Sequence, residues 1–175
     1  MNNDENKPIL QDVIIRHAIE NDLPALEWDG EYSHFRNLYR DIFESSIKGE
    51  TIMWLADLNK VGIIGQLFTQ LWSSKPELAD GRTRAYFFAF RVRNLYQNQG
   101  IGSKLLEIAE KDIIERGYSW CVLNVNKDNL TARRFYEKFG YQVVGSEIGR
   151  WSYIDQNGKV HEANEPSWRM EKPLK

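Results

Sequence analysis

The amino-acid sequence predicts one mixed domain of the α/β or α+β class, in which helices pack against a sheet. Three observations lead to this class. In several segments apolar residues recur at steps of three and four, which is typical of amphipathic helices. Shorter β-branched and aromatic runs lie between these segments and have the length and composition of strands. The chain has 175 residues, of which 42% are hydrophobic, and a chain of this size buries enough surface for one full core.

The first part of the chain predicts a strand, two helices and a hairpin, in that order. Val13–His17 is short and apolar and begins with β-branched residues, as a strand does. Asn21–Trp28 begins with residues that cap helices and carries a proline near its first turn, so it suits a short helix. Tyr32–Ile47 has aromatic and aliphatic residues at helical spacing and ends near a glycine. The expected hairpin strands are Thr51–Ala56 and Val61–Leu71.

The second part of the chain alternates strands and helices. Ala85–Val92 is almost continuously apolar, as expected for a central strand that is covered on both faces. A helix follows the glycine-rich segment Gln97–Gly102 and extends to about Arg116, with Gly117 as its cap. Ser119–Val125 is the next expected strand. The remaining elements are a helix, two strands, a polar excursion between these strands and a turn within it: Leu130–Phe139, Tyr141–Gly145, Trp168–Glu171, Gly149–Pro166 and Asp155–Gly158.

Charge and cysteine content exclude several classes of protein. The formal net charge is −2 and the pI is about 6.0, whereas a protein that binds nucleic acid through its phosphates has a basic surplus. Cys121 is the only cysteine, so no internal disulfide is expected, and three histidines without clustered spacing argue against a metal site. No apolar run approaches the roughly 20 residues of a membrane helix. The polar residues 1–12 lack the apolar core of a secretory signal. We therefore expect a disordered tail over residues 1–12, one domain over residues 13–175, a cytoplasmic location and no membrane partner.

Two amides and two glycines stand directly before an apolar-periodic helix in the segment Tyr96–Glu110. The first N–H groups of a helix lack internal partners, and the helix dipole is positive there. Glycines let a bulky anion approach these groups, so a phosphate or pyrophosphate is the expected occupant. A glycine-rich turn without a ligand is the alternative for this pattern alone. The P-loop and the dinucleotide fingerprint do not fit, because Ser103 and Lys104 stand in reverse order and Leu105 replaces the third glycine.

The segment Val92–Gly102 (VRNLYQNQGIG) resembles the Q/R-x-x-G-x-G/A pyrophosphate loop of the GNAT superfamily, the GCN5-related N-acetyltransferases. Asn94 stands where the family usually has proline, so the bend there is expected to differ slightly. Downstream, Asn129–Tyr141 (NLTARRFYEKFGY) is similar to the family's N-x-x-A-x-x-[FL]-Y-E-K-x-G-F segment. The three defining positions of the loop are filled by Gln97, Gly100 and Gly102.

The resemblance covers about residues 13–172 and implies both a fold and a cofactor. The implied fold has a central mixed, mostly antiparallel sheet with two splayed parallel strands, and helices on both faces. Acetyl-CoA is the implied cosubstrate. The glycine-rich loop holds its pyrophosphate, and its pantetheine arm lies between Phe90–Val92 and Val122–Val125. Asn129 is implied both as a helix cap and as a partner of that arm. The implied cofactor-binding residues are Phe90, Val92, Gln97, Asn98, Gln99, Gly100, Ile101, Gly102, Ser103, Asn129 and Tyr136.

Two catalytic roles also follow from the resemblance. A strand N–H near Val92 is expected to donate to the thioester carbonyl as that oxygen becomes negative, and Tyr136 matches the usual general acid of the family. A phenol with an ordinary pKa near 10 is protonated at neutral pH. From the residues alone, Tyr136 is better explained as a packed aromatic beside Phe135, and the motif favours the acid. Cys121 lies inside a predicted strand, so we expect the amine to attack the thioester directly, without a covalent enzyme intermediate.

The acceptor amine must be neutral to attack, so a base is expected near its site. Each candidate can also be explained as a solvated surface charge. Around and after the link between the first two helices, the candidates are Glu27, Asp29, Glu31, His34 and Glu44. In the polar excursion, which often rims the acceptor site in this family, they are His161 and Glu165.

The sequence thus predicts an acetyl-CoA-dependent N-acetyltransferase. It would move an acetyl group to a primary amine of a small molecule, or to the N-terminus or a lysine of a protein, by direct attack in a ternary complex. The alternative is a non-catalytic acyl-CoA-binding sensor or interaction module of the same fold. Retention of Tyr136 and of the intact loop favours the enzyme. A homodimer is also compatible with the sequence, which indicates no specific interface.

Overall fold

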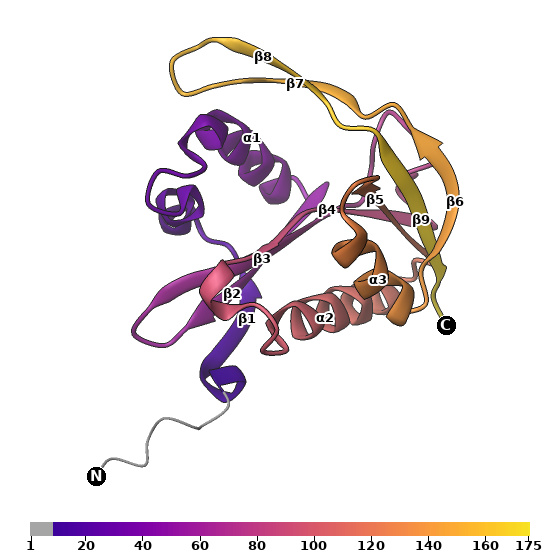
Figure 1. The fold of residues 1–175 in the computed structure, drawn as a ribbon, viewed down its shortest axis with the longest axis horizontal. Coiled ribbons are helices and arrows are strands. Elements are labelled where there is room, and N and C mark those ends of the chain that lie inside the picture. Colours follow the sequence, from indigo (N-terminus) through magenta and orange to yellow (C-terminus); the bar gives the residue numbers. More distant parts are fainter. Residues whose placement is uncertain (1–8) are drawn as a thin grey trace.

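A seven-stranded sheet forms the centre of the molecule, and a separate two-stranded hairpin lies beside it (Figure 1). The computed structural model describes residues 9–175, and no helix within this range is both long and apolar enough to cross a membrane. The strands are β1 (Val13–His17), β2 (Thr51–Leu58), β3 (Gly62–Gln70), β4 (Arg84–Val92), β5 (Trp120–Asn126), β6 (Gln142–Glu147), β7 (Arg150–Ile154), β8 (Val160–Asn164) and β9 (Ser167–Pro173). The α-helices are α1 (Arg36–Ile47), α2 (Ile101–Glu115) and α3 (Leu130–Lys138), and the 3-10 helices are η1 (Ile9–Asp12), η2 (Glu20–Glu27), η3 (Ser33–Phe35) and η4 (Asn94–Tyr96).

The large sheet is mixed. Its strands lie in the order β1-β2-β3-β4-β5-β9-β6. Every neighbouring pair is antiparallel except β4 and β5, which are parallel. A parallel pair needs a crossover connection, and α2 supplies it. This is the mostly antiparallel sheet with one parallel pair that the family resemblance implied.

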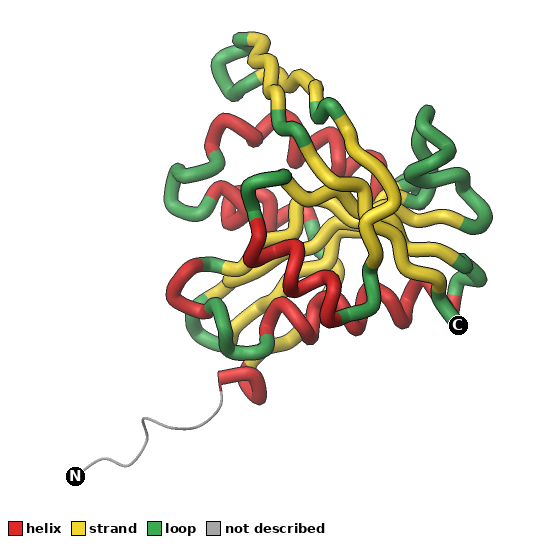
Figure 2. Tube along the Cα trace, turned by 45° about the vertical axis from the view of Figure 1, so that its right-hand side comes forward, coloured by secondary structure: helices red, strands yellow, loops and turns green. Residues whose placement is uncertain are grey.

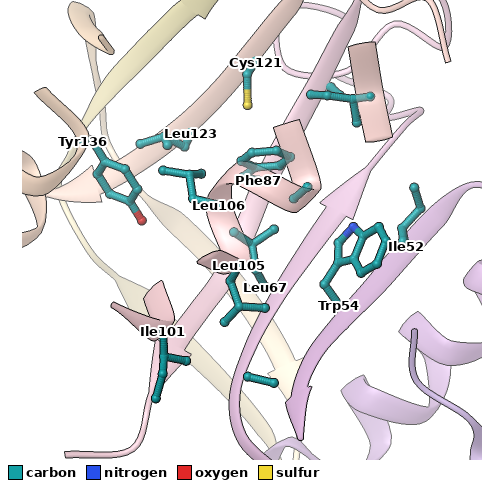
Figure 3. Packing of buried hydrophobic residues seen from close by; sticks show 14 of the residues in the cluster. Ile52, Trp54, Leu67, Phe87, Ile101, Leu105, Leu106, Cys121, Leu123 and Tyr136 are labelled. Atoms are coloured by element: carbon teal, nitrogen blue, oxygen red, sulfur yellow. The ribbon is translucent and has the colours of Figure 1, made fainter. Parts of the chain in front are cut away.

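Helices cover both faces of this sheet (Figure 2). Along β2, successive side chains alternate between two core clusters, because neighbouring residues of a strand point to opposite faces. Trp54 belongs to the cluster under α2 and α3, together with Leu105 and Leu106 (Figure 3). Leu55 belongs to the second cluster, which η2 and α1 cover and which includes Tyr39. The two-sided cover explains why β2 and β3 are apolar along most of their length.

The N-terminal boundary of the domain differs from the expectation. Ile9–Asp12 form a 3-10 turn, and the side chains of Ile9 and Leu10 pack against the core cluster under α2. A Cβ atom added at Gly100 would lie 3.3 Å from Leu10 Cδ2, so this turn also touches the start of α2. Residues 9–12 therefore belong to the folded domain. The rest of the expected tail, residues 1–8, lies outside the described residues.

The expected polar excursion contains a β-hairpin that the sequence pattern did not predict. β7 and β8 pair antiparallel around the turn at Asp155–Gly158, which lies where it was expected. Most residues of both strands are exposed. Polar and apolar residues alternate in β7 only over residues 150–153, and β8 shows no such alternation, so the signal of a half-buried strand is at its lower limit. The hairpin extends over α1 (Figure 1), where Asn37 Nδ2 donates to the carbonyl oxygen of Asp155 at 2.7 Å.

Three other elements differ in type or length. The expected helix Tyr32–Ile47 is divided into the turn η3 and α1, which begins at Arg36. The segment around Pro24 forms a 3-10 helix, and this proline has no N–H to donate to a longer helix. β2 continues to Leu58, because its last residues pair with β1 across the sheet.

Candidate active site

The parallel strands β4 and β5 separate part of the way along the sheet. They pair over four residue pairs, of which the last is Phe87 with Leu123. Beyond this point β5 stays paired with β9, and β4 stays paired with β3 as far as Val92. Ala89 has a φ of 51° and lies where the register between β3 and β4 shifts, so it forms a bulge in β4. The splay leaves the last backbone groups of β4 without a partner from β5.

Val92 has an unpaired backbone N–H at this splay. The N–H of Arg93 donates to the carbonyl of Ile64 at 2.8 Å, so these residues form a hydrogen-bonded pair between β4 and β3. Bonded and non-bonded pairs alternate in an antiparallel ladder, and Val92 opposite Gly65 is therefore a non-bonded pair. The N–H of Val92 points away from β3, toward β5. The carbonyl of Val92 accepts a hydrogen bond from Gln97 Nε2 at 2.9 Å.

Side-chain amides hold the turn before α2. Gln97 Nε2 also donates to Asn94 Oδ1 at 3.1 Å, and Gln99 Nε2 donates to the carbonyl of Leu95 at 3.0 Å. Gly100 stands at the N-cap with a φ of 86°, a left-handed conformation that glycine adopts without steric cost. No side chain closes this helix end. Side-chain amides therefore hold the turn in place, and the first N–H groups of α2 have no capping side chain.

These N–H groups form a candidate anion site. Within residues 9–175, no protein group accepts a hydrogen bond from the backbone N–H groups of residues 98–103. Free N–H groups and the positive end of a helix dipole together favour a bound anion. A Cβ atom at Gly102 would make ordinary contacts of 3.7–3.9 Å with Phe90, Phe135 and Val92. Packing of the protein alone therefore does not require a glycine at position 102.

Tyr136 lies on α3 and is only 9% exposed. Its ring centroid is 5.4 Å from that of Phe135 and 6.2 Å from that of Phe90 on β4. Within residues 9–175, no hydrogen bond to its hydroxyl lowers its pKa. Burial, with smaller contributions from Cys121 and Tyr86, raises that pKa well above the ordinary value. The phenol is therefore protonated at neutral pH, and its ring also fills part of the core.

Asn129 and Cys121 have clear structural roles. Asn129 Oδ1 accepts a hydrogen bond from the N–H of Ala132 at 3.0 Å, which caps α3 as the sequence predicted. Cys121 is fully buried, and burial raises the pKa of its thiol well above the ordinary value. The hydroxyl oxygen of Tyr141 lies 3.0 Å from Cys121 Sγ, within hydrogen-bonding distance. A thiol that is buried and protonated is no nucleophile, which agrees with the expectation.

Two of the candidate bases are held in ion pairs. Glu27 Oε1 lies 2.5 Å from Arg36 Nε, and Asp29 Oδ2 lies 2.9 Å from Arg93 Nη1. The hydrogen bond from Arg36 lowers the pKa of Glu27, which makes this carboxylate a weaker base. Glu31 is exposed, and no ion pair within residues 9–175 involves it.

His34 lies in an aromatic surface that joins η3 to the hairpin. Its ring centroid is 4.1 Å from that of Phe35 and 5.8 Å from that of Tyr153 on β7. The centroid of Trp151 lies 6.0 Å from that of Phe35, and His161 stacks on Tyr153 at 5.1 Å. We call this surface the aromatic wall; its members are Tyr32, His34, Phe35, Trp151, Tyr153 and His161.

The candidates on the hairpin are bound within the hairpin itself. His161 Nε2 lies 2.7 Å from Asp155 Oδ2, and this hydrogen bond is the main cause that lowers the pKa of Asp155. Glu165 Oε2 accepts from Trp151 Nε1 at 3.1 Å. Glu44 is exposed on α1. The structure thus brings His34 and His161 to the same wall and keeps the two paired carboxylates, Glu27 and Asp29, in the link before α1.

The sequence reasoning did not single out three polar residues under α1. Arg91, Tyr39 and Gln66 each have a buried polar atom without a hydrogen-bond partner in the described part of the chain. The available signal was Arg91 itself, since it is a charged residue inside the apolar run AYFFAFRV. Nothing local in the sequence marks the other two.

The fold and the site together define a class of protein. A free helix N-terminus beside two splayed parallel strands can bind a phosphate-bearing cofactor and accept its arm between the strands. The model of the acetyltransferase (GNAT) family matches residues 18–141, and the chain belongs to this family, which transfers acetyl groups and uses acetyl-CoA as cosubstrate. A comparison with curated proteins found no match.

Solved structures share this fold at low sequence identity. The ribosomal-protein-S18-alanine N-acetyltransferase from Escherichia coli is 21% identical, with a TM-score of 0.67 and coverage of 93% of this chain and 94% of that chain. Ard1 from Thermoplasma volcanium is 18% identical, with a TM-score of 0.70 and coverage of 94% and 99%. The structure of yncA from Salmonella typhimurium with acetyl-CoA is 18% identical, with a TM-score of 0.67 and coverage of 94% and 95%.

Proposed function

We propose that this protein is an N-acetyltransferase that moves an acetyl group from acetyl-CoA to a primary amine by direct attack in a ternary complex. The observation that carries the proposal is the position of Val92. Its unpaired N–H points toward the splay of β4 and β5. Its carbonyl is bound by Gln97, from the loop whose free N–H groups begin α2. One short segment thus combines an anion site with a hydrogen-bond donor for a reacting carbonyl.

The residues present fit acetyl-CoA. The free N–H groups of residues 98–103 suit a pyrophosphate, and Gly102 adds no side chain in front of them. Phe90 and Val92 on one side and Asn129 on the other are proposed to line the path of the pantetheine arm. When bound, acetyl-CoA supplies an activated acetyl thioester. The chain's own residues then have to orient that group and manage charge and protons.

Two residues are proposed to act on the reacting atoms. The N–H of Val92 would donate to the carbonyl oxygen as negative charge develops there, and one such donor is typically worth roughly 3 kcal/mol of transition-state stabilisation. Tyr136 would pass its proton to the leaving sulfur. Burial raises the pKa of Tyr136, so the phenol is protonated at neutral pH and has a proton to donate, although the same shift makes it a weaker acid.

The base is proposed among the candidates that are not already paired. Glu27 and Asp29 are better suited to fix the link before α1, since each is bound to an arginine. Glu31 and His34 lie in the same link without an ion pair in the described residues, and either could remove a proton directly or through water. An ammonium has no lone pair, so this base has to remove a proton before the amine attacks.

The proposed function is tested by release of the CoA thiol from acetyl-CoA across a panel of amines. The panel contains polyamines, aminoglycosides, amino acids, and peptides with free N-termini or lysines; peptides are included because a structural neighbour is named for acetylating a ribosomal protein. Thiol reagents are suitable here, since Cys121 is buried and does not compete. Release with one class identifies the acceptor. Binding of acetyl-CoA without release with any class would instead favour the sensor.

The variant Tyr136→Phe distinguishes the two explanations for this residue, a general acid and a packed core aromatic. The variant keeps the ring contacts with Phe90 and Phe135 and removes only the acidic hydroxyl. We expect kcat to fall roughly 100-fold, the usual scale for loss of a general acid, while the Kd of acetyl-CoA stays the same. Rates are measured by thiol release and affinity by calorimetry. A wild-type rate in Tyr136→Phe would show that the residue only packs.

A further inference from the structure

Arg91 lies on β4 directly before Val92, but its side chain occupies the opposite face of the sheet. Phe90 and Val92 lie toward α2, where both approach the position of a Cβ atom at Gly102. Side chains alternate along a strand, and the guanidinium of Arg91 accordingly lies under the start of α1. It is 4.0 Å from the ring centroid of Tyr32 and 5.5 Å from that of Phe35. It therefore lies beside the aromatic wall, on the face opposite the anion site at the start of α2.

Three buried polar atoms around Tyr39 have no hydrogen-bond partner of standard geometry within residues 9–175. They are the hydroxyl oxygen of Tyr39, Gln66 Oε1 and Nη1 of this guanidinium. Burial raises the pKa of Tyr39, whereas the charge of Arg91 and hydrogen-bonding contacts from Gln66 and Arg91 lower it, so the three side chains are neighbours. The amide nitrogen of Gln66 is already used, since it donates to the carbonyl of Ala89 at the bulge of β4. These contacts join the guanidinium to neutral groups only, and none of them gives Arg91 an anionic partner within residues 9–175.

Arg91 differs from every other half-buried arginine of the described chain. Six arginines in residues 9–175 are neither fully buried nor fully exposed. Five of them pair with a carboxylate within 4 Å, and Arg91 does not. The five pairs are Arg16–Asp22, Arg84–Glu171, Arg93–Asp29, Arg133–Glu137 and Arg169–Glu147.

Removing a cation from water without an anionic partner is costly, and the rings of Tyr32 and Phe35 offset only part of that cost. A bound carboxylate would complete the site, because its two oxygens match the planar fork of a guanidinium. The hydroxyl of Tyr39 could donate to the same group. The phosphates of a cofactor do not meet this need, since their site is on the other face of the sheet.

We infer that the acceptor is an amine that also carries a carboxylate, and that Arg91 binds this carboxylate. The inference rests on the proposed function and names its substrate class. The positions of Arg91 and Val92 are consecutive, so a small molecule can bind the guanidinium and still bring its amine to the splay of β4 and β5. An α-amino acid has this arrangement, and so does the end of a peptide that places a carboxylate near its amine. Polyamines and aminoglycosides lack the anion and would bring further positive charge to an unpaired arginine.

The test compares acceptors that differ only in the carboxylate. CoA release is measured with free α-amino acids, with their carboxamides, and with the corresponding amines that lack the carboxyl group. One such set is L-phenylalanine, L-phenylalaninamide and phenethylamine. We expect kcat/KM for the best acid to exceed that of its amide at least about 10-fold, the scale of one charge-assisted bidentate contact. Dipeptide amides with aspartate or asparagine at the second position show whether the carboxylate of a peptide serves instead.

Three variants connect that preference to Arg91. In Arg91→Gln the ratio of acid to amide should fall to about 1, mainly through a higher KM for the acid. Arg91→Lys keeps the charge without the planar fork, so its ratio of acid to amide should lie between those of the wild type and Arg91→Gln. The matched control is Arg93→Gln, two residues away and already paired with Asp29, in which the ratio should stay as in the wild type. Circular dichroism and the Kd of acetyl-CoA verify that each variant is folded.

The outcomes separate this inference from the proposed function. Two results would overturn the inference and leave the proposed acetyltransferase activity intact. One is a kcat/KM for the amide that equals or exceeds that for the acid. The other is an unchanged ratio of acid to amide in Arg91→Gln. If no amine releases CoA, the proposed function fails. In that case calorimetry measures the binding of the same acids and amides in the presence of CoA, and this binding tests the carboxylate site. Binding of the acid alone, lost in Arg91→Gln, supports the carboxylate site, and equal or absent binding of the two overturns it.

Discussion

Gly100 and Gly102 stand two residues apart at the start of α2, and the chain uses them for different physical reasons. Gly100 has a positive φ and lies against Leu10, so its conformation and its surroundings both disfavour a side chain. Gly102 has helical geometry and room for a Cβ atom. At position 100 the turn itself requires glycine, whereas at position 102 packing does not, which is consistent with the proposed approach of an anionic ligand to the helix.

This difference makes Gly102 a sharp probe of the anion site. Gly102→Glu should weaken acetyl-CoA binding by more than about 100-fold, because its carboxylate would repel the pyrophosphate at the N–H groups that hold it. Gly102→Ala, whose Cβ would make only ordinary contacts, should bind within a few-fold of the wild type. Calorimetric titration with acetyl-CoA measures both. Unchanged affinity in Gly102→Glu would show that the pyrophosphate binds elsewhere.

At the scale of elements, the hairpin and α1 together form one side of the proposed acceptor region. One hydrogen bond, from Asn37 Nδ2 to the carbonyl of Asp155, joins them, and the aromatic wall continues across the join. The polar exposed strands β7 and β8 contribute little burial of their own. Their position therefore depends on this contact and on the rings that pack around Phe35.

Loss of that contact should loosen the hairpin without disturbing the cofactor site. In Asn37→Ala we expect faster trypsin cleavage after Lys159, which follows the hairpin turn, and a several-fold higher KM for the acceptor. The Kd of acetyl-CoA should not change, since the loop before α2 is held by its own amides. Asp41→Ala, at an exposed position on the same helix, is the control and should behave as the wild type. A normal cleavage rate in Asn37→Ala would mean that the rings alone hold the hairpin.

At the scale of the whole molecule, the core beneath α2 and α3 unites the sheet and the catalytic face. Tyr136 and Cys121 belong to the same cluster as Leu105 and Leu106 (Figure 3). A buried hydrogen-bonded group ties it together, in which the hydroxyl of Tyr141 reaches both Glu110 Oε1, at 2.7 Å, and Cys121 Sγ. The position of Tyr136 thus depends on the integrity of the whole core.

Cys121 reports on that integrity. Because the thiol is fully buried and its pKa is raised by burial, alkylating reagents should leave the native protein unmodified. As denaturant is added, labelling of Cys121 should appear together with the loss of circular dichroism, as expected for one cooperative domain. Labelling well before the loss of ellipticity would reveal a local opening beneath α2.

The sequence by itself determined the local features of this protein. Glycine conformation, helix capping and short-range hydrogen bonds act over a few residues, so the loop Gln97–Gly102, the cap at Asn129 and the position of Tyr136 on α3 could all be predicted. Strand and helix positions followed from apolar periodicity, because burial on one face leaves a period in the chain. The motif match to the GNAT superfamily carried the fold class and the cofactor.

Only the tertiary structure decided the features that depend on partners distant in sequence. The strands β7 and β8 left little apolar period, only Trp151 and Tyr153 in β7, since most of their residues are exposed. Glu27 and Asp29 looked like free bases until folding brought Arg36 and Arg93 to them. Arg91 looked like one more residue of a central strand. What distinguishes Arg91 is that no carboxylate within residues 9–175 pairs with it. Burial and pairing of a charge are set by segments that meet only when the chain has folded, so the sequence could not reveal this.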